Sequence, residues 1–491
     1  MDALGLVALV VGAGWIIGKL PGRAKNDKTT EPVLKEMPKS KVASKVGGTS
    51  AEKSSIQVTP EYELAKGLVN RQFPLIFVTG GAGTGKSTFI SWLTEQFEGH
   101  VLIGAPTGVA ALNVQGKTLH SLCALPPAWI LNRDIKEYRS SIARGANLLI
   151  IDEISMVNAN LLDAVSEFFK MNRGVDRPFG GLPVVLVGDL FQLPPVISSN
   201  VRELFTSTYK SSKFHGAKSL SDCPYYAIEL KKAFRQVDQT FVDILGRIRE
   251  GVDIDFALHS LNSHCLITDE PPEGAVWLSP RNKEVEGRNS RKLESLPGPS
   301  IQFHGELTGK FKDDRLPSPI VVDLRVGAQV MFTKNSAKWV NGSIGTVTKL
   351  FPKSVHVRLH ETGDEVEVVR ESWEQFDYFF DRSSSRIERS VVGTYTQIPL
   401  ILAWSVTIHK SQGKTIERVH IDLGRGAFET GQTYVALSRC RSMDKLSLSR
   451  PLDRSDIRVD PEVQLFYNDI RALIKATPLD KMLESVKAKF R

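Results

Sequence analysis

Leu75-Ile-Phe-Val-Thr-Gly-Gly-Ala-Gly-Thr-Gly-Lys-Ser-Thr88 is the stretch of sequence that decides the fold. Its first five residues are apolar or β-branched and predict a buried strand. The residues that follow match the pattern Gly-x-x-x-x-Gly-Lys-Ser, and Phe89-Ile-Ser-Trp-Leu93 is typical of a helix. A strand, a Gly-rich loop and a helix in this order form a phosphate-binding loop. The sequence therefore predicts an α/β fold built on a nucleotide-binding domain.

The residues of this loop have distinct expected tasks. Glycines allow the backbone to turn its N–H groups onto phosphate oxygens, and the helix N-terminus adds a favourable dipole. Lys86 is expected to reach the β and γ phosphates, and Ser87 to ligate magnesium. The residues expected to bind ATP with Mg²⁺ are Gly80, Gly81, Ala82, Gly83, Thr84, Gly85, Lys86, Ser87 and Thr88.

A second apolar strand begins at Asn147 and ends in the adjacent carboxylates Asp152 and Glu153. Strands of an open α/β sheet bring their carboxyl ends to one crevice, so Asp152 should lie beside the nucleotide. Asp152 is expected to hold magnesium, directly or through water. Glu153 is expected to orient and deprotonate the attacking water.

Composition sets the broad class of the protein. A chain of 491 residues has room for roughly three domains, and 41% hydrophobic with 24% charged residues is a globular composition. The net charge of +8 permits a polyanionic partner, although residues 19–60 hold nine Lys or Arg against four Asp or Glu. The four cysteines have no metal-ligand spacing, which predicts reduced, buried thiols in an intracellular protein of the cytoplasm or nucleoid.

The N-terminal segment 3–18 is an uncharged, apolar run of 16 residues followed by Lys19 and Arg23. This run is short for a bilayer span but usable in a thin membrane. The basic flank on its C-terminal side favours an anchor with the rest of the chain in the cytoplasm. An incidental apolar tail is the alternative, and residues 21–58 are expected to form a flexible basic linker.

Eight further motifs occur in a fixed order along the chain: APTGVAALN, TLHSL, IIDEISMV, RPFGG, VGDLFQLPPV, FRQ, TIHKSQGKT and YVALSR. Together they resemble the Pif-type (petite integration frequency) DNA helicases. Those are superfamily-one helicases of the 5′→3′ subgroup, related to RecD and Dda. The resemblance covers roughly residues 60–450.

The resemblance implies two RecA-like P-loop NTPase domains with a small SH3-like β insertion in the second. The first ATPase domain is expected at 59–225, with a short insertion at 123–144. The second is expected at 226–317 and 397–455, interrupted by the β subdomain at 318–396, and residues 456–491 should form a helical tail. In the short insertion, Trp129 is a candidate strand-separating wedge, and packing on the sheet is its alternative.

The resemblance also assigns residues to hydrolysis. Arg235 and Arg439 would contact the γ phosphate from the second domain, so that hydrolysis depends on domain closure. Gln192, between Phe191 and two prolines, would sense the γ phosphate or the attacking water and pass that state toward the DNA. A turn-packing amide is the alternative for Gln192. In many relatives a Gln that reads adenine precedes the phosphate strand, but Tyr62 and Glu63 occupy that region here, which leaves the preference for ATP open.

A further group of residues is implied to touch single-stranded DNA, with phosphate contacts positioning it and little reading of sequence. For Thr107, a helix cap is the alternative interpretation. Lys410 and Lys414 would add attraction that weakens with salt. The implied DNA-binding residues are Pro106, Thr107, Gly108, Thr118, His120, His409 and Ser411.

These observations predict a magnesium-dependent ATPase that translocates on single-stranded DNA and unwinds tailed or forked duplexes 5′→3′, as a monomeric motor. Roles in DNA replication, repair, recombination and telomere maintenance are implied by the resemblance. A DNA-dependent translocase without strand separation is one alternative. A membrane-tethered DNA-binding scaffold is another, but it would have no need of Lys86, Asp152, Glu153 and Arg439 together.

Overall fold

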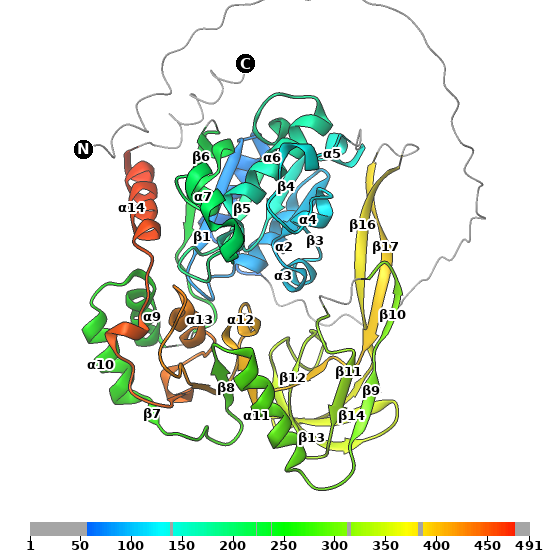
Figure 1. Ribbon diagram of the computed structural model, residues 1–491, viewed down its shortest axis with the longest axis vertical. Helices are drawn as coiled ribbons and strands as arrows, with labels where there is room; N and C mark the ends of the chain where they lie inside the picture. The colour runs from blue at the N-terminus through cyan, green and yellow to red at the C-terminus, as the bar shows by residue number, and fades with distance from the viewer. Residues whose placement is uncertain are drawn as a thin grey trace, which may run out of the picture. The chain divides into compact units, whose positions relative to one another are not determined.

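The computed structural model describes residues 56–137, 141–221, 223–236, 238–311, 316–381 and 386–476. Its first domain is built on a six-stranded parallel sheet with the order β3-β2-β4-β5-β1-β6 (Figure 1). Every residue of the central strands β1, β4 and β5 is buried, as expected of a parallel sheet covered on both faces. The strands are β1 (Leu75–Gly80), β2 (Val101–Ala105), β3 (Lys117–Thr118), β4 (Leu148–Ile151), β5 (Val184–Val187) and β6 (Tyr225–Leu230).

Helices cover this first sheet, and the phosphate loop leads from β1 directly into one of them, α2. The longest, α6, begins at its cap Asn158, whose side chain accepts the Leu161 N–H, and ends at Gly174 in the left-handed conformation. The helices are α1 (Pro60–Asn70), α2 (Lys86–Gln96), α3 (Gly108–Asn113), α4 (Leu119–Leu122), α5 (Ser141–Gly145), α6 (Ala159–Arg173), α7 (Arg202–Thr208) and α8 (Lys218–Ser221).

The second domain has a five-stranded parallel sheet with the order β19-β8-β20-β21-β7. Its strands are β7 (Leu266–Ile267), β8 (Val276–Ser279), β19 (Ser405–Thr407), β20 (Val419–Ile421) and β21 (Leu446–Leu448). Its helices are α9 (Gln239–Glu250), α10 (Ile254–His264), α11 (Asn282–Glu294), α12 (Ile408–Ser411) and α13 (Gln432–Leu437). Two parallel α/β sheets confirm the expected fold class.

The inserted β subdomain contains a five-stranded antiparallel sheet with the order β15-β14-β13-β12-β18, and smaller sheets β10-β17-β16 and β11-β9. The expected bounds 318–396 are too narrow, because β9 and β10 precede them and β18 follows them. The strands are β9 (Ile301–His304), β10 (Glu306–Gly309), β11 (Val321–Leu324), β12 (Gln329–Phe332), β13 (Ile344–Leu350), β14 (Ser354–Leu359), β15 (Glu365–Val369), β16 (Glu371–Asp381), β17 (Arg386–Gln397) and β18 (Leu400–Leu402).

The expected boundary between the two ATPase domains, at 225/226, is also corrected. It falls inside β6, which lies beside β1 in the first sheet with Tyr225 opposite Leu75. The C-terminal helix α14 (Pro461–Ala476) returns to the first domain, where Val463 and Tyr467 are buried in its hydrophobic core and the helix contacts β6 (Figure 1). A helical tail was expected here, but not its place in the first domain.

The candidate membrane anchor at residues 3–18 lies outside the described residues, and its role stays a prediction. Among the described residues, no helix is long and apolar enough to cross a bilayer. All four cysteines are unpaired and buried, as expected.

Acid is expected to destabilise the fold through His420, which is buried in β20. Its Nδ1 lies 3.0 Å from the Ser447 hydroxyl, and its ring meets Trp277 edge-on at 5.3 Å. Burial lowers the pKa of His420 to about 4. The unfolded chain therefore takes up this proton first, at a pH near 6.5, and stability is lost as the pH falls from about 6.5 to about 4.

The measurement is urea unfolding at pH 7 and pH 5 for the wild type and His420→Gln. Between pH 7 and pH 5, the free energy of unfolding of the wild type should fall by on the order of 1–3 kcal/mol more than that of the variant. His259→Gln, at an exposed position of α10, is the matched control and should behave as the wild type. Equal losses in the wild type and His420→Gln would contradict the assignment.

Candidate active site and DNA groove

The phosphate loop connects β1 to α2 and is packed against the segment that leaves β6. Gly83 has a φ of 79°, and an added Cβ would lie 2.6 Å from the Arg235 Cβ, so only glycine fits there. The Gly83 carbonyl accepts the Phe234 N–H at 2.8 Å. Lys86 donates from Nζ to the carbonyls of Gly80 and Gly81, each at 2.9 Å, and burial lowers its pKa. The lysine is thus folded back over the loop that is expected to hold phosphates.

Asp152 and Glu153 follow β4 at the same edge of the sheet as the phosphate loop. Burial raises the pKa of Asp152 to about 7, and the charge of the neighbouring Glu153 carboxylate contributes to the same rise. Burial also raises the pKa of Glu153, opposed by the charges of Lys86 and Arg439. Asp152 is buried and Glu153 beside it is half-buried, and oxygen ligands such as carboxylates are those that Mg²⁺ prefers. Asp152 and Ser87 offer a carboxylate and a hydroxyl oxygen, and a magnesium ion between them stays a prediction.

Gln192 lies at the interface between the two ATPase domains and is buried. Its amide oxygen accepts from Nε2 of Gln412 at 3.2 Å, and the same Nε2 donates to Oε2 of Glu153 at 3.2 Å. Its own Nε2 is 3.4 Å from Asp189 Oδ2. Gln412, which our sequence analysis did not single out, thus joins the expected base to the expected sensor.

The two arginines both lie at the interface between the domains, but in different ways. Arg235 follows β6 of the first sheet rather than a strand of the second domain, and it donates to the carbonyls of Ser438 and Gly413 at 3.3 and 3.2 Å. Arg439 is buried and donates to the carbonyls of Ser411 and Lys414, each at 3.2 Å. Burial lowers the pKa of Arg439 to about 9, and the positive charge of Arg235 contributes to the same fall. Arg439 therefore stays charged at neutral pH.

A buried ion pair next to the phosphate loop was not anticipated. Arg249, at the end of α9, donates from Nε to Asp189 Oδ1 at 3.0 Å. Asp189 Oδ2 also accepts the Tyr434 hydroxyl at 3.2 Å, and that hydroxyl accepts the Ala82 N–H at 2.7 Å. An N–H group of the phosphate loop is therefore bonded to a residue of YVALSR in the second domain.

Gly431, which precedes α13, allows this close approach. Its φ is 72°, and an added Cβ would lie 2.3 Å from the Phe191 carbonyl and 2.6 Å from that of Gln192. Any side chain at 431 would push α13 away from the Gln192 loop. A glycine directly before a helix carries no signal for such a contact in the sequence.

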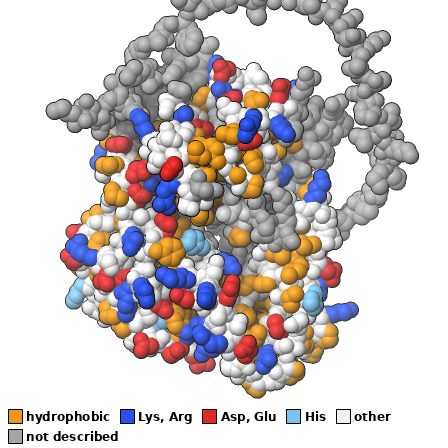
Figure 2. Space-filling view, in the orientation of Figure 1, with side chains coloured by type: hydrophobic (Ala, Val, Ile, Leu, Met, Phe, Trp, Pro, Cys, Tyr) orange, Lys and Arg blue, Asp and Glu red, His pale blue; other side chains and the backbone are white. Residues whose placement is uncertain are grey.

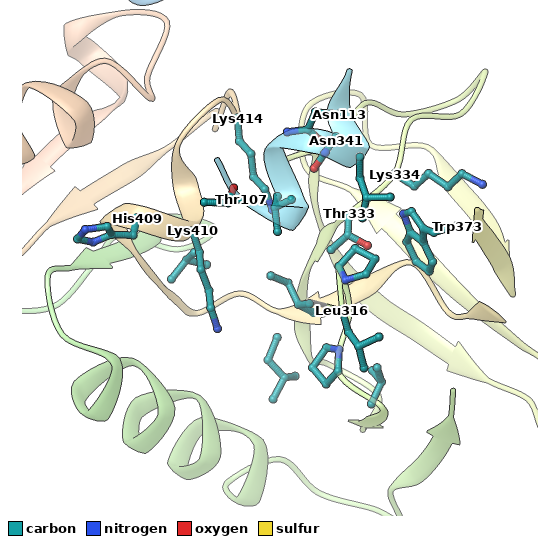
Figure 3. Close-up of a pocket in the computed structure, with 18 of the residues that line it drawn as sticks. Thr107, Asn113, Leu316, Thr333, Lys334, Asn341, Trp373, His409, Lys410 and Lys414 are labelled. Atoms are coloured by element: carbon teal, nitrogen blue, oxygen red, sulfur yellow. The ribbon is translucent and has the colours of Figure 1, made fainter. Parts of the chain in front are cut away.

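A groove with a volume of about 1620 Å³ runs between the two ATPase domains and the β subdomain. Figure 3 shows its walls: Thr107 and Asn113 come from the first domain, His409, Lys410 and Lys414 from the second, and Thr333, Lys334 and Trp373 from the β subdomain. Burial lowers the pKa of Lys414 to about 8. On the face seen in Figure 2, basic and acidic side chains of the described residues are intermixed.

The other residues expected to bind DNA differ in where they lie relative to this groove. Ser411 is fully buried, and its hydroxyl donates to the Ile408 carbonyl, so it faces its own helix. Thr107 caps α3 by accepting the Ala110 N–H, and it also lines the groove. Gly108 and Thr118 line a smaller neighbouring cavity of about 50 Å³. Pro106 and His120 line neither of these cavities.

Two aromatic residues of the first domain have packing roles. Trp129 meets Phe205 of α7 edge-on at 4.9 Å and lies beside Tyr209, so it packs on a helix, and its role as a wedge stays a prediction. The Tyr62 hydroxyl donates to the Gly85 carbonyl at 2.7 Å, and its ring lies 5.1 Å from that of Phe89. A buried tyrosine thus supports the phosphate loop where an adenine-reading amide was expected.

Comparison with known proteins agrees with this arrangement. The model of the PIF1-like helicase family matches residues 61–255. The chain is 32% identical to the ATP-dependent DNA helicase RRM3 of Saccharomyces cerevisiae, over 86% of this chain and 68% of that protein. It is 33% identical to the ATP-dependent DNA helicase Pif1 of Bdellovibrio bacteriovorus, over 85% of this chain and 93% of that protein.

Solved structures are similar over most of the described fold. Pif1 from a Bacteroides species in complex with ADP-AlF4 is 32% identical with a TM-score of 0.78, over 84% of this chain and 97% of that one. The chain spans 61% of the length of the human PIF1 helicase. Sequence identity of 32–33% to RRM3 and to the bacterial Pif1, over more than two thirds of each, shows that this chain belongs to the PIF1-like helicases, a family of ATP-dependent DNA helicases.

Proposed function

We propose that this chain couples ATP hydrolysis to 5′→3′ movement along single-stranded DNA and so unwinds tailed or forked duplexes. One observation carries the proposal: Gln412 contacts both Glu153 and Gln192 and lies three residues from His409, which lines the groove. A change at the nucleotide therefore reaches a wall of the groove within one short loop.

The solved relatives support the choice of ligand. Bacteroides Pif1 has been solved bound to single-stranded DNA, and another structure concerns unwinding at forked double-stranded DNA by two coordinating Pif1 helicases. Each is 32% identical to this chain, which covers 98% of it.

The residues at the nucleotide side suit phosphoryl transfer to water. Magnesium, held by Ser87 and Asp152, would neutralise phosphate charge. Lys86 would leave the Gly80 and Gly81 carbonyls for the β and γ phosphates. Glu153 would accept the proton of the attacking water, while Gln192 and Gln412 orient that water, and Arg235 closes the site from the domain boundary.

The test measures ATP hydrolysis with and without single-stranded DNA, together with unwinding of 5′-tailed, 3′-tailed, forked and blunt duplexes. DNA-stimulated hydrolysis and unwinding of the 5′-tailed and forked substrates alone are expected. Hydrolysis that ignores DNA would overturn the proposal. Stimulated hydrolysis without unwinding would favour a translocase that does not separate strands.

Gln192→Ala is expected to keep nucleotide and DNA binding but to lose DNA-stimulated hydrolysis and unwinding together. The reason is that the Gln412 amide would lose one acceptor and the attacking water one ligand, at a cost of about 10²–10³-fold in turnover. The measurement is single-turnover hydrolysis at saturating DNA. Gln302→Ala, at an exposed position of β9, is the control. Normal unwinding by Gln192→Ala would leave only the turn-packing role.

A further inference from the structure

The C-terminal helix α14 reaches the ATPase centre through one residue, Tyr467. This tyrosine is buried, and its hydroxyl is hydrogen-bonded to the hydroxyl of Thr79, the residue just before the phosphate loop. Its ring is stacked on Phe191, with the ring centres 4.7 Å apart and the planes inclined by 29°. Phe191 directly precedes Gln192. Tyr467 therefore touches the start of the phosphate loop and the base of the Gln192 loop at once.

Tyr467 also holds the buried cation of this site. Its hydroxyl accepts from Nη2 of Arg249 at 3.1 Å, while Nε of the same guanidinium donates to Asp189. The guanidinium carbon lies 4.6 Å from the centre of the Phe191 ring and 5.1 Å from that of Tyr467. A buried charge needs several well-placed partners, and these two rings supply them together with Tyr467, Asp189 and Glu250, whose Oε1 accepts from Nη1 of Arg249 at 3.0 Å.

The same contacts continue to the phosphate loop. Asp189 accepts the Tyr434 hydroxyl, and Tyr434 accepts the Ala82 N–H. The connected series Tyr467, Arg249, Asp189, Tyr434 and Ala82 thus alternates between α14, the second domain and the first. Arg471, one turn further along α14, adds ion pairs to Glu229 of β6 and Glu250 of α9 at 2.8 and 2.7 Å, which fix the helix to both domains.

We propose that Tyr467 is a positioning residue for ATP hydrolysis, acting through Arg249 on Asp189 and Tyr434 and through Phe191 on the Gln192 loop. The proposal rests on hydrolysis at this site. It assigns a role in the motor to a helix that lies outside every motif of the ATPase domains. Without the Tyr467 hydroxyl, Arg249 loses one of its acceptors and holds Asp189 less precisely, and through Asp189 it holds Tyr434 and the Ala82 N–H less precisely.

The test compares Tyr467→Phe, which keeps the ring, with the wild type in DNA-stimulated hydrolysis. Turnover should fall about tenfold, as expected for slight misplacement of reacting groups, while the KM for ATP and the affinity for single-stranded DNA change less than about twofold. Tyr225→Phe is the control, because Tyr225 is a half-buried residue of β6, the strand that α14 contacts, and it lies outside this set of contacts. This variant should hydrolyse ATP as the wild type does.

A double-mutant cycle with Arg249→Lys separates positioning from a merely structural role. If Tyr467 acts through Arg249, the double variant should be no slower than the slower single variant. Wild-type turnover in Tyr467→Phe, additive losses in the cycle, or lower stability with unchanged turnover of the folded protein would each overturn the proposal. A wild type that does not hydrolyse ATP would overturn the proposed function as well, so the two failures are distinguishable.

Discussion

Glu153→Gln is expected to lower the turnover of DNA-stimulated ATP hydrolysis by about 10²–10⁴-fold with nucleotide binding retained. Gln412 Nε2 donates to Glu153 Oε2 at 3.2 Å. Glutamine has nearly the same shape as glutamate, and its amide oxygen can still accept this hydrogen bond. It cannot take a proton from water. The fold and the contact between the domains should therefore persist while the chemical step fails.

The measurement pairs steady-state phosphate release with titration of a fluorescent ATP analogue. Glu95→Gln, at an exposed position of α2, is the matched control and should hydrolyse ATP at the wild-type rate. A Glu153→Gln variant that keeps more than about a tenth of the wild-type turnover would show that another group accepts the proton.

Arg439→Lys is expected to lose hydrolysis and DNA affinity together. An arginine supplied to a phosphoryl-transfer site contributes about 10³–10⁵ in rate, and lysine cannot reproduce its planar set of donors. Here the guanidinium also holds the carbonyls of Ser411 and Lys414, which belong to the loop that carries His409. Removing those two hydrogen bonds loosens a wall of the groove as well as the ATPase centre.

This prediction is checked by hydrolysis at saturating DNA and by single-stranded DNA binding without nucleotide. Arg441→Lys is the control, because Arg441 is 46% exposed and pairs with Glu361 at 2.9 Å on the surface. If Arg439→Lys abolishes hydrolysis but binds DNA as the wild type does, the hydrogen bonds to Ser411 and Lys414 have no part in shaping the groove.

The phosphate loop and the paired carboxylates could be predicted because their signal is local. A buried strand followed by Gly80–Ser87, and another followed by Asp152, dictate where those side chains lie whatever the rest of the chain does. The domain boundary could not be predicted in the same way. The residues of β6 would form a strand in either domain, and only their pairing with β1 assigns them to the first.

Arg249 and Tyr467 were missed for a different reason. An arginine in the last turn of a helix such as α9 usually lies in solvent, where it interacts with the helix dipole. Tyr467 lies on an amphipathic helix whose apolar face could cover any core. Their contact depends on α14 returning across both domains, and no spacing within either helix encodes that path. The placement of Ser411 was missed because a serine hydroxyl has a partner in its own helix turn.

The loop that begins at Thr407 has a mechanical consequence. His409, Gln412 and Glu153 all line the groove, and Gln412 also donates to Glu153, so one short segment of the second domain serves both the DNA side and the nucleotide side. Because the connection is short, one side can move little without the other. A force that pulls the DNA strand backward would therefore disturb the geometry around Glu153, and we expect the rate of ATP hydrolysis to fall under such a load.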